Sequence, residues 1–390
     1  MRAAHAVQTA AARAAGAGRM RAWRVHGYGA LGELRLDEAR VPPLRAPDDV
    51  LVRVSAASIN PIDVAMIGGY GARALNTLRA LEGGGDGGDG GVEFPLVPGR
   101  DFVGTVERAG PAARLRRAQR VWGVVPPHRQ GSHAQFVVVR DCWAGPAPAA
   151  LDEHAAGGAL YAALTACAAL RAAGLSAGAE GGHARVLLLG LGGVGQAALQ
   201  LLARRRAEVT VGCSLDLAPL ALRLGAARAF DRHQDDYDRS LAECGPYDVV
   251  VDCAGLGGAA AGAAPWRFSR YVTLSTPLLR EMDARGVAAG AVCAGAELLL
   301  HSARAAAAGL RAAPPSALPR PPHVRWAFFS PNAADIELLR RLAERRQFSV
   351  CVERVFPWWR GAEAYERAAQ GGARGKLLLD FAAREDAAAL

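Results

Sequence analysis

The sequence contains little lysine and little cysteine, and both shortages limit what the protein can be. Lys376 is the single lysine among 46 lysine and arginine residues. Because the arginine bias extends through the whole chain, it does not indicate recognition of nucleic-acid phosphates. The 7 cysteines are scattered from position 142 to position 351 and match neither a disulfide framework nor a C-x-x-C metal site. A reducing compartment is the simplest interpretation.

Long apolar runs are also missing. Residues 155–170 form the longest smooth stretch, which is rich in small residues and shorter than the ~20 residues of a membrane span. We therefore expect no transmembrane helix. The chain of 390 residues exceeds the size at which a single core normally keeps growing, so two domains are expected.

Acidic residues are absent from the start of the chain, where Glu33 is the first. The first 24 residues contain five arginines interleaved with alanine, which is typical of an organelle transit segment. These arginines supply over half of the net charge of +9, so the basic pI requires no nucleic-acid partner. A disordered, alanine-rich tail without a targeting role is the alternative. Met20 marks where the folded body is expected to begin.

What the chain does contain is a strand, a glycine turn and a helix in succession. The apolar residues 186–189 lead into G-L-G-G-V-G at 190–195, and residues 196–206 repeat apolar positions at helical spacing. In G-x-G-x-x-G the first glycine permits a tight turn, the second lets a pyrophosphate approach, and the third lets helix pack against strand. Because N–H groups at a helix start bind phosphate, we expect a dinucleotide here.

Ser214 is expected to contact the adenosine ribose. It follows the second apolar strand, 208–211, at the usual number of positions after the glycine turn. An NAD-selective site offers Asp or Glu at this point, whereas a serine does not repel a 2′-phosphate. NADP(H) is favoured. Asp216 argues for NAD if it turns inward. Arg232, after the third predicted strand, either supplies positive charge for the phosphate or is a solvated surface arginine.

The order of predicted elements indicates an α/β protein. Residues 20–150 contain alternating strands and predict a small β-rich domain. The strands are expected at 24–40, 49–58, within 98–106, at 119–123 and at 136–139. From about 151 helices alternate with apolar strands, which predicts a doubly wound parallel sheet. Its strands are expected at 185–190, 208–212, 229–231, 247–253, 270–275 and 324–329, followed by a helix at 332–346. Loose surface insertions are expected at 82–91 and 303–322.

Several blocks, in the right order, resemble the zinc-free branch of the medium-chain dehydrogenase/reductase superfamily, the quinone oxidoreductases. The similarity extends over nearly all of residues 20–382, and within that branch it is greatest to the reticulon-interacting group of mitochondrial oxidoreductases. The blocks are 57–64, 68–72, 95–101, 124–127, 271–277, 325–329 and 373–376.

The resemblance implies a GroES-like catalytic domain built from both ends of the chain, 20–150 and 345–390. A Rossmann domain would be inserted at 151–344, with the cofactor in the cleft, and residues 1–19 would be a mitochondrial transit segment. The implied cofactor is NADPH, the implied acceptor a quinone-type small molecule, and the implied process coenzyme Q (ubiquinone) metabolism. Implied protein partners are of the reticulon type or enzymes of coenzyme Q biosynthesis. A homodimer through an edge strand of the nucleotide-binding domain is left open.

No metal site is expected. Zinc-dependent relatives place a cysteine where this chain has Asn60 and a His-Glu pair where it has Arg100 and Asp101, so neither a thiolate nor an imidazole ligand is available there. His128 and His133 lie five positions apart in a Pro/Gly-containing loop and are interpreted as ordinary surface residues.

Without a metal, hydride transfer needs orientation more than side-chain chemistry, because the nicotinamide carries the hydride. Asn60, Asp63 and Tyr70 match family positions facing the cleft and are catalytic candidates for orienting the acceptor or relaying a proton. A turn capped by Asn60 and a half-buried packing role for Tyr70 are the alternatives. Tyr161 and Thr165, four apart on a predicted helix, either face the cofactor or pack in the core.

The expected cofactor contacts combine the glycine turn with positions carried over from the family. They are Gly190, Gly192, Gly193, Val194, Gly195, Ser214, Arg232, Cys253, Leu274, Ala327, Phe329, Ala373 and Arg374. The chain departs from the family pattern in a shorter glycine turn, in Cys253 for a polar residue and in Gly372 for a histidine. Cys253 is either a reactive thiol near the cofactor or an inert buried residue.

The resulting prediction is an NADPH-dependent, zinc-independent reductase of quinones or conjugated carbonyls. One alternative is reduction of an enoyl thioester, for which Tyr70 would donate a proton to carbon. The other is an NADPH-binding regulatory or scaffold protein with little turnover.

Overall fold

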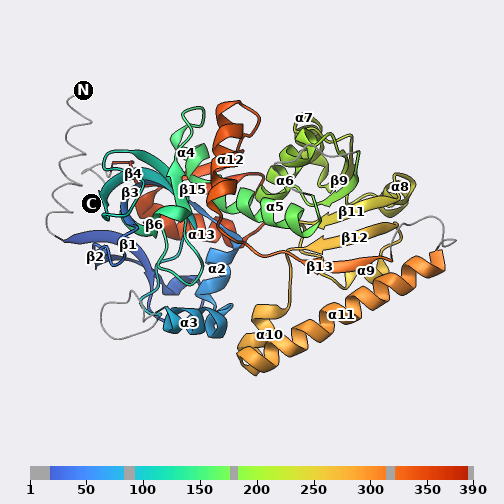
Figure 1. Cartoon of the computed structure of the whole chain (residues 1–390), viewed down its shortest axis with the longest axis horizontal. Helices are drawn as coiled ribbons and strands as arrows, with labels where there is room; N and C mark the ends of the chain where they lie inside the picture. The colour runs from blue at the N-terminus through green and yellow to red at the C-terminus, as the bar shows by residue number, and fades with distance from the viewer. Residues whose placement is uncertain (1–17, 83–92, 176–182, 313–320, 385–390) are drawn as a thin grey trace. The chain divides into compact units, whose positions relative to one another are not determined.

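The computed structural model describes residues 18–82, 93–175, 183–312 and 321–384, and its contacts divide the chain into two compact units (Figure 1). The β-rich unit is drawn from Met1–Leu160, Pro331–Glu344 and Val352–Leu390, and the parallel-sheet unit from Tyr161–Ser330 and Arg345–Cys351. Each unit is therefore discontinuous in sequence. The domain bounds expected at 20–150, 151–344 and 345–390 remain a prediction.

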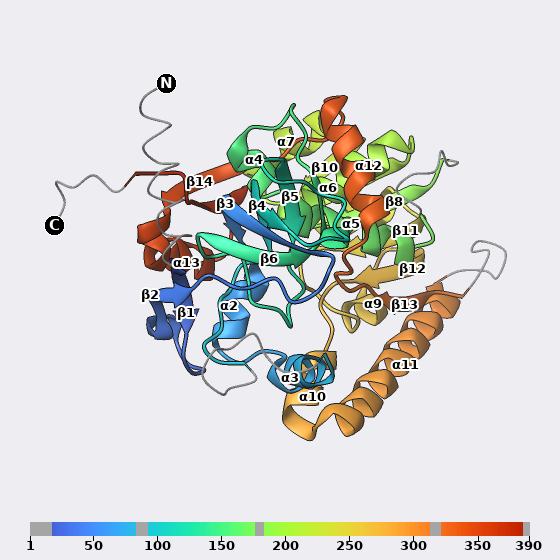
Figure 2. The ribbon, with the colours of Figure 1, turned by 60° about the vertical axis from the view of Figure 1, so that its left-hand side comes forward.

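The main sheet of the β-rich unit is organised around β3 (Asp49–Ile59), which pairs antiparallel with three other strands. Its order is β14 (Val352–Pro357), β15 (Lys376–Asp380), β3, β4 (Asp101–Ala109), β5 (Arg120–Val124) and β7 (Ala144–Pro146). Strand β6 (Phe136–Arg140) also pairs with β3 and lies beside it in Figure 2. A second sheet pairs β1 (Arg19–Val25) with β2 (Leu34–Arg40). Because β3 is covered along its length, nearly all its side chains are buried.

The helices of the β-rich unit are short. They are α2 (Pro61–Ile67), α3 (Ala72–Leu81), α4 (Glu153–Gly157), α12 (Ala333–Glu344) and α13 (Gly361–Ala369). A core cluster formed by Trp23, Ile67, Tyr365 and Leu377 brings together β1, α2, α13 and β15. This packing fixes the junction between β3 and α2, where Asn60 lies.

The parallel-sheet unit contains six strands, all parallel. Their order is β10 (Arg228–Asp231), β9 (Glu208–Cys213), β8 (Arg185–Leu189), β11 (Tyr247–Asp252), β12 (Phe268–Thr273) and β13 (His323–Trp326). This is the 3-2-1-4-5-6 order of a dinucleotide-binding sheet. The central strands are apolar and buried on both faces, as a covered parallel sheet requires. The α/β fold class and the doubly wound sheet predicted from the sequence are confirmed.

Two expectations about the parallel-sheet unit need correction. The segment 303–322 is not loose throughout, because helix α11 extends over Val287–Ala312 (Figure 1). Alanine has the highest helix propensity, and the first proline of the segment comes only at position 314. The sixth strand ends at Trp326 and not at residue 329. Within the described ranges no helix, α11 included, has the length and hydropathy of a membrane span.

A third correction concerns the β-rich unit, where residues 24–40 are not continuous strand. Glycine-containing bends and a short 3-10 helix, Leu31–Glu33, separate β1 from β2. The two strands pair with each other as a hairpin. The predicted transit segment lies outside the described residues except for its last two positions, and so does the glycine-rich tract from residue 83 onward.

Candidate functional site

The glycine turn expected at 190–195 joins β8 to α6 (Gly193–Arg204). Gly190 has a φ of +88°, and a Cβ on it would lie 2.9 Å from the backbone nitrogen of Ala254. A Cβ on Gly195 would lie 2.1 Å from the carbonyl oxygen of Gly190. Both positions therefore require glycine, the first for its backbone conformation and the second for the close approach of helix to turn.

Gly192 differs from these two glycines: a Cβ placed on it would have no atom within 4 Å in the described part of the chain, its chain neighbours and its own helix backbone apart. It is the N-cap of α6, and no side chain caps the helix there. The first N–H groups of a helix have no partner inside it, and Gly193 and Val194 in this first turn are partly exposed. The open space above the helix start fits a pyrophosphate bound by backbone donors.

Asp252, at the end of β11, fixes the loop that packs against Gly190. Its carboxylate accepts four hydrogen bonds of 2.8–3.1 Å from the backbone N–H groups of residues 254–257. It also accepts one of 2.8 Å from the Thr273 hydroxyl, and it is fully buried. Asp252 was not among the residues predicted from the sequence. An aspartate between a buried strand and a glycine-containing turn is the signal that would have found it.

Cys253 follows directly, and its N–H donates to the Leu189 carbonyl oxygen at 2.8 Å. The side chain is half-buried. Desolvation, with a smaller contribution from the Asp252 carboxylate, raises the pKa of the Cys253 thiol well above its usual range. Because the thiolate is the reactive form, the structure favours the inert alternative for this cysteine.

Ser214 directly follows β9, and Arg232 directly follows β10. The two strands are parallel neighbours, and the N–H of Arg232 donates to the Cys213 carbonyl oxygen at 2.8 Å. The structure thus brings Ser214 and Arg232 to one corner of the sheet, with Ser214 partly exposed and Arg232 exposed. Asp216 is exposed in the 3-10 turn that follows.

Leu274 follows β12 and Ala327 follows β13, where the Ala327 N–H donates to the end of β12 at 3.0 Å. The ring of Phe329 stacks on Tyr161, with centroids 4.3 Å apart. Thr165 donates its hydroxyl hydrogen to the Tyr161 carbonyl oxygen at 2.7 Å. The hydroxyl of Thr165 is therefore used within α5 (Leu160–Ala172), and Tyr161 presents its ring to Phe329.

The carboxyl ends of the six parallel strands thus carry every cofactor residue predicted in this unit. Strands of this topology bind nucleotides at that edge. Ala373 and Arg374, the other two cofactor candidates, belong to the β-rich unit. Ala373 is partly exposed and Arg374 exposed, and the Arg374 N–H donates to the Glu353 carboxylate.

In the β-rich unit Asn60 joins β3 to α2 and is 3% exposed. Its side-chain amide is bonded at both ends. Nδ2 donates to Asp101 Oδ1 at 3.0 Å and to Ser58 Oγ at 3.2 Å. Oδ1 accepts from Lys376 Nζ at 2.6 Å, across 316 positions of sequence. We call Ser58, Asn60, Asp101 and Lys376 the Asn60 cluster. Asn60 was predicted from the sequence as a site residue, whereas Lys376 was not.

Asp63 lies three positions after Asn60 and is fully buried. One carboxylate oxygen accepts from the Asn60 N–H at 2.8 Å. The other accepts from the Gly99 N–H at 2.8 Å and from Arg100 Nε at 3.2 Å. With both oxygens engaged inside the fold, Asp63 holds the junction between β3 and α2, and its predicted role toward the acceptor gains no support from these contacts.

His133 is buried, which corrects the expectation of an ordinary surface histidine. Its Nε2 donates to the Ser58 carbonyl oxygen at 3.1 Å, and its Nδ1 accepts from the Tyr365 hydroxyl at 2.8 Å. Burial lowers the pKa of the His133 imidazole, which favours the neutral ring. His128 is half-buried, 3.2 Å from Glu82.

Tyr70 follows α2 and is 36% exposed. Its N–H donates to the Ala65 carbonyl oxygen at 3.2 Å, which fixes the backbone after the helix. The role of Tyr70 toward the acceptor remains a prediction. In the part of the chain that the structure describes, no three His, Cys, Asp or Glu residues gather as a metal site.

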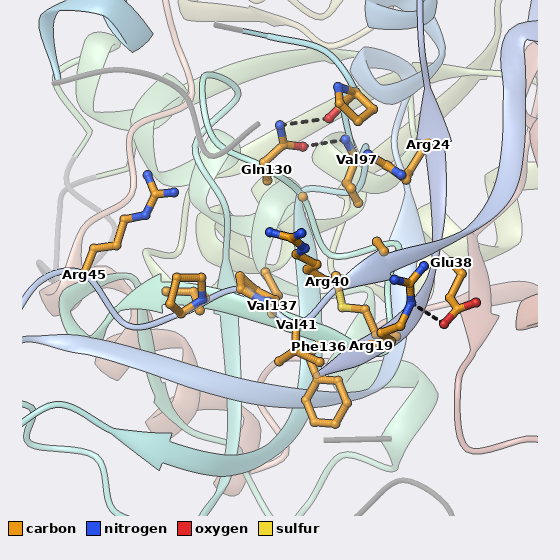
Figure 3. A pocket seen from close by; sticks show the side chains of 17 residues that line it. Arg19, Arg24, Glu38, Arg40, Val41, Arg45, Val97, Gln130, Phe136 and Val137 are labelled. Carbon is orange, nitrogen blue, oxygen red and sulfur yellow. Dashed lines mark hydrogen bonds and ion pairs between the residues drawn. The ribbon is translucent and has the colours of Figure 1, made fainter. Parts of the chain in front are cut away.

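A cavity of about 600 Å³ lies elsewhere in the β-rich unit, beside β1, β2 and β6 (Figure 3). Val97, Phe136 and Val137 line it together with several arginines. Arg19 is paired with Glu38 at 2.5 Å and Arg24 with Asp37 at 3.7 Å. None of the residues predicted for the cofactor or the acceptor lines this cavity.

Comparison with known proteins supports the relationship suggested by the fold. Residues 46–149 match the alcohol dehydrogenase GroES-like domain, and residues 224–379 match the zinc-binding dehydrogenase family. The protein named NAD(P)H oxidoreductase RTN4IP1, mitochondrial, of Drosophila melanogaster is 36% identical, over 93% of this chain and 86% of its own length. Its namesake from Homo sapiens is 34% identical, over 93% of this chain and 89% of its own length.

Among solved structures, the quinone oxidoreductase from Coxiella burnetii has a TM-score of 0.70 at 21% identity, covering 93% of this chain and 99% of its own. This likeness shows the shared fold. Together with the matched domains and the 36% identity to the Drosophila protein, it establishes that the chain belongs to the medium-chain dehydrogenase/reductase superfamily, in the group of the RTN4IP1 oxidoreductases.

Proposed function

We propose that this protein is an NADPH-dependent oxidoreductase that reduces a quinone or a similarly conjugated carbonyl. The observation that carries the proposal is the open glycine turn at the start of α6, where a Cβ on Gly192 would meet no atom of the described residues within 4 Å, apart from its chain neighbours and its own helix. The similarity to proteins named NAD(P)H oxidoreductases supports the same reading. When bound, the nicotinamide supplies the hydride, so the residues of the chain have to bind and orient.

Ser214 and Arg232 support NADPH over NADH. The residue at the end of β9 has no charge to repel a 2′-phosphate, and the neighbouring strand end provides an arginine. Arginine is well suited to bind phosphate through its planar fork of N–H donors. Asp216 is the opposing feature, since a carboxylate near the ribose hydroxyls favours NADH.

The cofactor and acceptor residues named above are proposed to act in this reaction. Gly190 and Gly195 shape the turn, and the backbone of Gly193 and Val194 binds the pyrophosphate. Leu274, Ala327, Phe329, Ala373 and Arg374 are proposed as further cofactor contacts. Asn60 and Tyr70 are proposed to orient the acceptor, and Asp63 to keep Asn60 in place.

We also propose that the protein works in mitochondria, in coenzyme Q metabolism, because the names of the Drosophila and human relatives call them mitochondrial. The arginine-rich, acid-free start of the sequence supports this address. Expression of the full chain with a C-terminal fluorescent tag, compared with a chain that lacks residues 1–19, tests it. Loss of the mitochondrial signal in the shortened chain is the expected result.

A quinone panel with the purified full chain tests the activity. We expect NADPH oxidation above the quinone-free background and weaker oxidation of NADH. NADPH binding without turnover of any quinone would instead favour a regulatory or scaffold protein. Turnover of an enoyl thioester, abolished by Tyr70→Phe, would favour an enoyl reductase, because that reaction needs a proton donor to carbon.

A further inference from the structure

We infer that Lys376 is a further catalytic residue, whose ammonium donates a hydrogen bond to the acceptor oxygen that becomes negative during reduction. The inference rests on the proposed function and deepens it by naming the group that binds the carbonyl oxygen of the acceptor. The Asn60 cluster holds the ammonium in place for this task.

The first observation is that Lys376 is anchored at one point only. Its Nζ donates to Asn60 Oδ1 at 2.6 Å, and the residue is 7% exposed. A lysine ammonium has three donors. Among residues 18–82, 93–175, 183–312 and 321–384, Asn60 Oδ1 is the one acceptor that the ammonium contacts. Two buried donors are therefore available to an oxygen of a bound molecule, and buried donors normally have partners.

The second observation is that the side-chain amide of Asn60, which holds Lys376, has only one favourable orientation. Asn60 Nδ2 donates to the Asp101 carboxylate at 3.0 Å, while Asn60 Oδ1 accepts from the ammonium. A flipped amide would place its NH₂ group against the ammonium and its oxygen against the carboxylate. Both contacts would be repulsive. Asp101 is itself held by the Ser58 hydroxyl at 2.5 Å, so the position of Lys376 Nζ is determined by a buried, rigid chain of hydrogen bonds.

The third observation is that the ammonium of Lys376 is buried, where desolvation of a charge costs free energy. The residue begins β15, whose next three positions are buried leucines. Burying an ion costs several kcal/mol before its partners compensate. The other buried ion pair nearby, Asp63 with Arg100 at 3.2 Å, makes direct contact. Lys376 instead reaches its counter-charge, Asp101, through the neutral amide of Asn60.

The fourth observation is the choice of lysine. All other basic side chains among the 46 lysine and arginine residues are arginine, so this position departs from the composition of the whole chain. Gly158 makes room for the straight stem, since a Cβ on it would lie 3.2 Å from Lys376 Cβ and Cγ. An ammonium is a compact point charge, whereas a guanidinium is a broad fork that needs several acceptors.

The chemistry that fits is stabilisation of an oxyanion. When a quinone accepts a hydride with its two electrons from NADPH, NADP⁺ and a hydroquinone monoanion form, and a proton from solvent completes the hydroquinone. The negative charge grows on a carbonyl oxygen. A pre-positioned cationic donor in a dry site stabilises that charge without reorganisation, and loss of one such donor typically lowers kcat by about 10²–10³-fold.

Turnover of substituted enzymes is the first arm of the test. In Lys376→Met we expect kcat/KM for the quinone to fall about 100-fold, with the Kd for NADPH within about twofold of that of the original protein. Arg108→Lys is the matched control, because Arg108 is exposed on β4 of the same unit, and it should change neither value. A Lys376→Met protein that folds and reduces the quinone at the original rate would overturn the inference.

A charge-balance control is the second arm. If Lys376 only compensates Asp101, the double variant Lys376→Met/Asp101→Asn should recover both thermal stability and turnover. We expect it to recover stability and remain slow. Recovery of turnover would overturn the inference, and the double variant also keeps the test valid if Lys376→Met alone does not fold.

The third arm does not depend on turnover. p-Nitrophenol bound beside Lys376 should ionise at lower pH than in solution, which is followed by the absorbance of the phenolate. The shift should vanish in Lys376→Met and persist in Arg108→Lys. If the original protein reduces no quinone, the proposed function fails while this titration still decides for or against the oxyanion site.

Discussion

The carbonyl oxygen of Gly190 lies against the Cα of Gly195, so close that a Cβ on Gly195 would be 2.1 Å from it. Gly195→Ala therefore has to displace α6 from the turn. We expect it to lower the free energy of unfolding by about 1–3 kcal/mol, as overpacking does. Urea denaturation of the two proteins measures this difference.

Gly192→Ala is the matched partner of that substitution, because a Cβ there has no contact within 4 Å among the residues that the structure describes, its chain neighbours and its own helix apart, and the residue has a negative φ. Its unfolding midpoint should equal that of the original protein, while the Kd for NADPH rises at least about tenfold because the methyl group occupies the space of the phosphate. Unchanged affinity in Gly192→Ala would contradict the proposed place of the pyrophosphate.

Ser214→Asp should shift the coenzyme preference from NADPH toward NADH. A carboxylate at the end of β9 repels a 2′-phosphate and accepts hydrogen bonds from the ribose hydroxyls. We expect the ratio of the two affinities to change by at least ~1 kcal/mol, about fivefold. Isothermal titration with both coenzymes checks it, with Ser214→Ala as the neutral control. An unchanged ratio would reject Ser214 as the residue that reads the ribose.

Asp252→Asn should destabilise the parallel-sheet unit, because it replaces one accepting oxygen with a donor that faces backbone N–H groups. Asp252 serves four such groups and the Thr273 hydroxyl, and breaking a buried network of this kind costs about 3 kcal/mol. Asp248→Asn is the control, because Asp248 is exposed and accepts from the Arg185 N–H. Chemical denaturation of both variants gives the comparison, and equal losses would argue against a special role for Asp252.

Because His133 is buried, we expect the free energy of unfolding to be lower at acidic pH. Burial lowers the pKa of its ring in the folded protein, so below about pH 6.5 the unfolded chain takes up a proton that the folded protein refuses. The free energy of unfolding should therefore fall as the pH drops from 7.5 to 5.5. The fall should be smaller in His133→Gln, by up to about 1.4 kcal/mol per pH unit.

Glutamine suits this test because it keeps one donor for Ser58 and one acceptor for Tyr365, whose contacts with the ring are 3.1 and 2.8 Å. His183→Gln, at an exposed position, is the control. If His133→Gln and the original protein lose the same free energy between the two pH values, the buried ring is not the source.

The parallel sheet was predictable because each of its strands is a short apolar run, which can be recognised from the local sequence alone. The strand before Gly190 and the helix after it follow one another in sequence, so the nucleotide turn could be located too. The prediction of a loose segment was wrong over 303–312, where helix α11 continues, because alanine favours helix even when prolines follow nearby in the sequence.

The Asn60 cluster could not be assembled from the sequence, because its members are brought together by pairing of strands from opposite ends of the chain. Lys376 stands beside Asn60 only because β15 pairs with β3, with Leu377 opposite Ile59. Nothing local in the sequence near residue 376 indicates that register. The Asp252 loop is a different case, since all its backbone donors lie within five positions, and a search for Asx turns would have found it.

The pairing of β3 with β15 also has a consequence for the order of folding. β15 lies between β14 and β3, so the sheet of the β-rich unit stays open until the last part of the chain has been made. The parallel-sheet strands, Arg185 to Trp326, come earlier and need no residue from beyond Cys351. Such long-range strand closure is slow. During synthesis the parallel-sheet unit should therefore gain protease resistance first. Until β15 has been made, β3 keeps an unpaired edge.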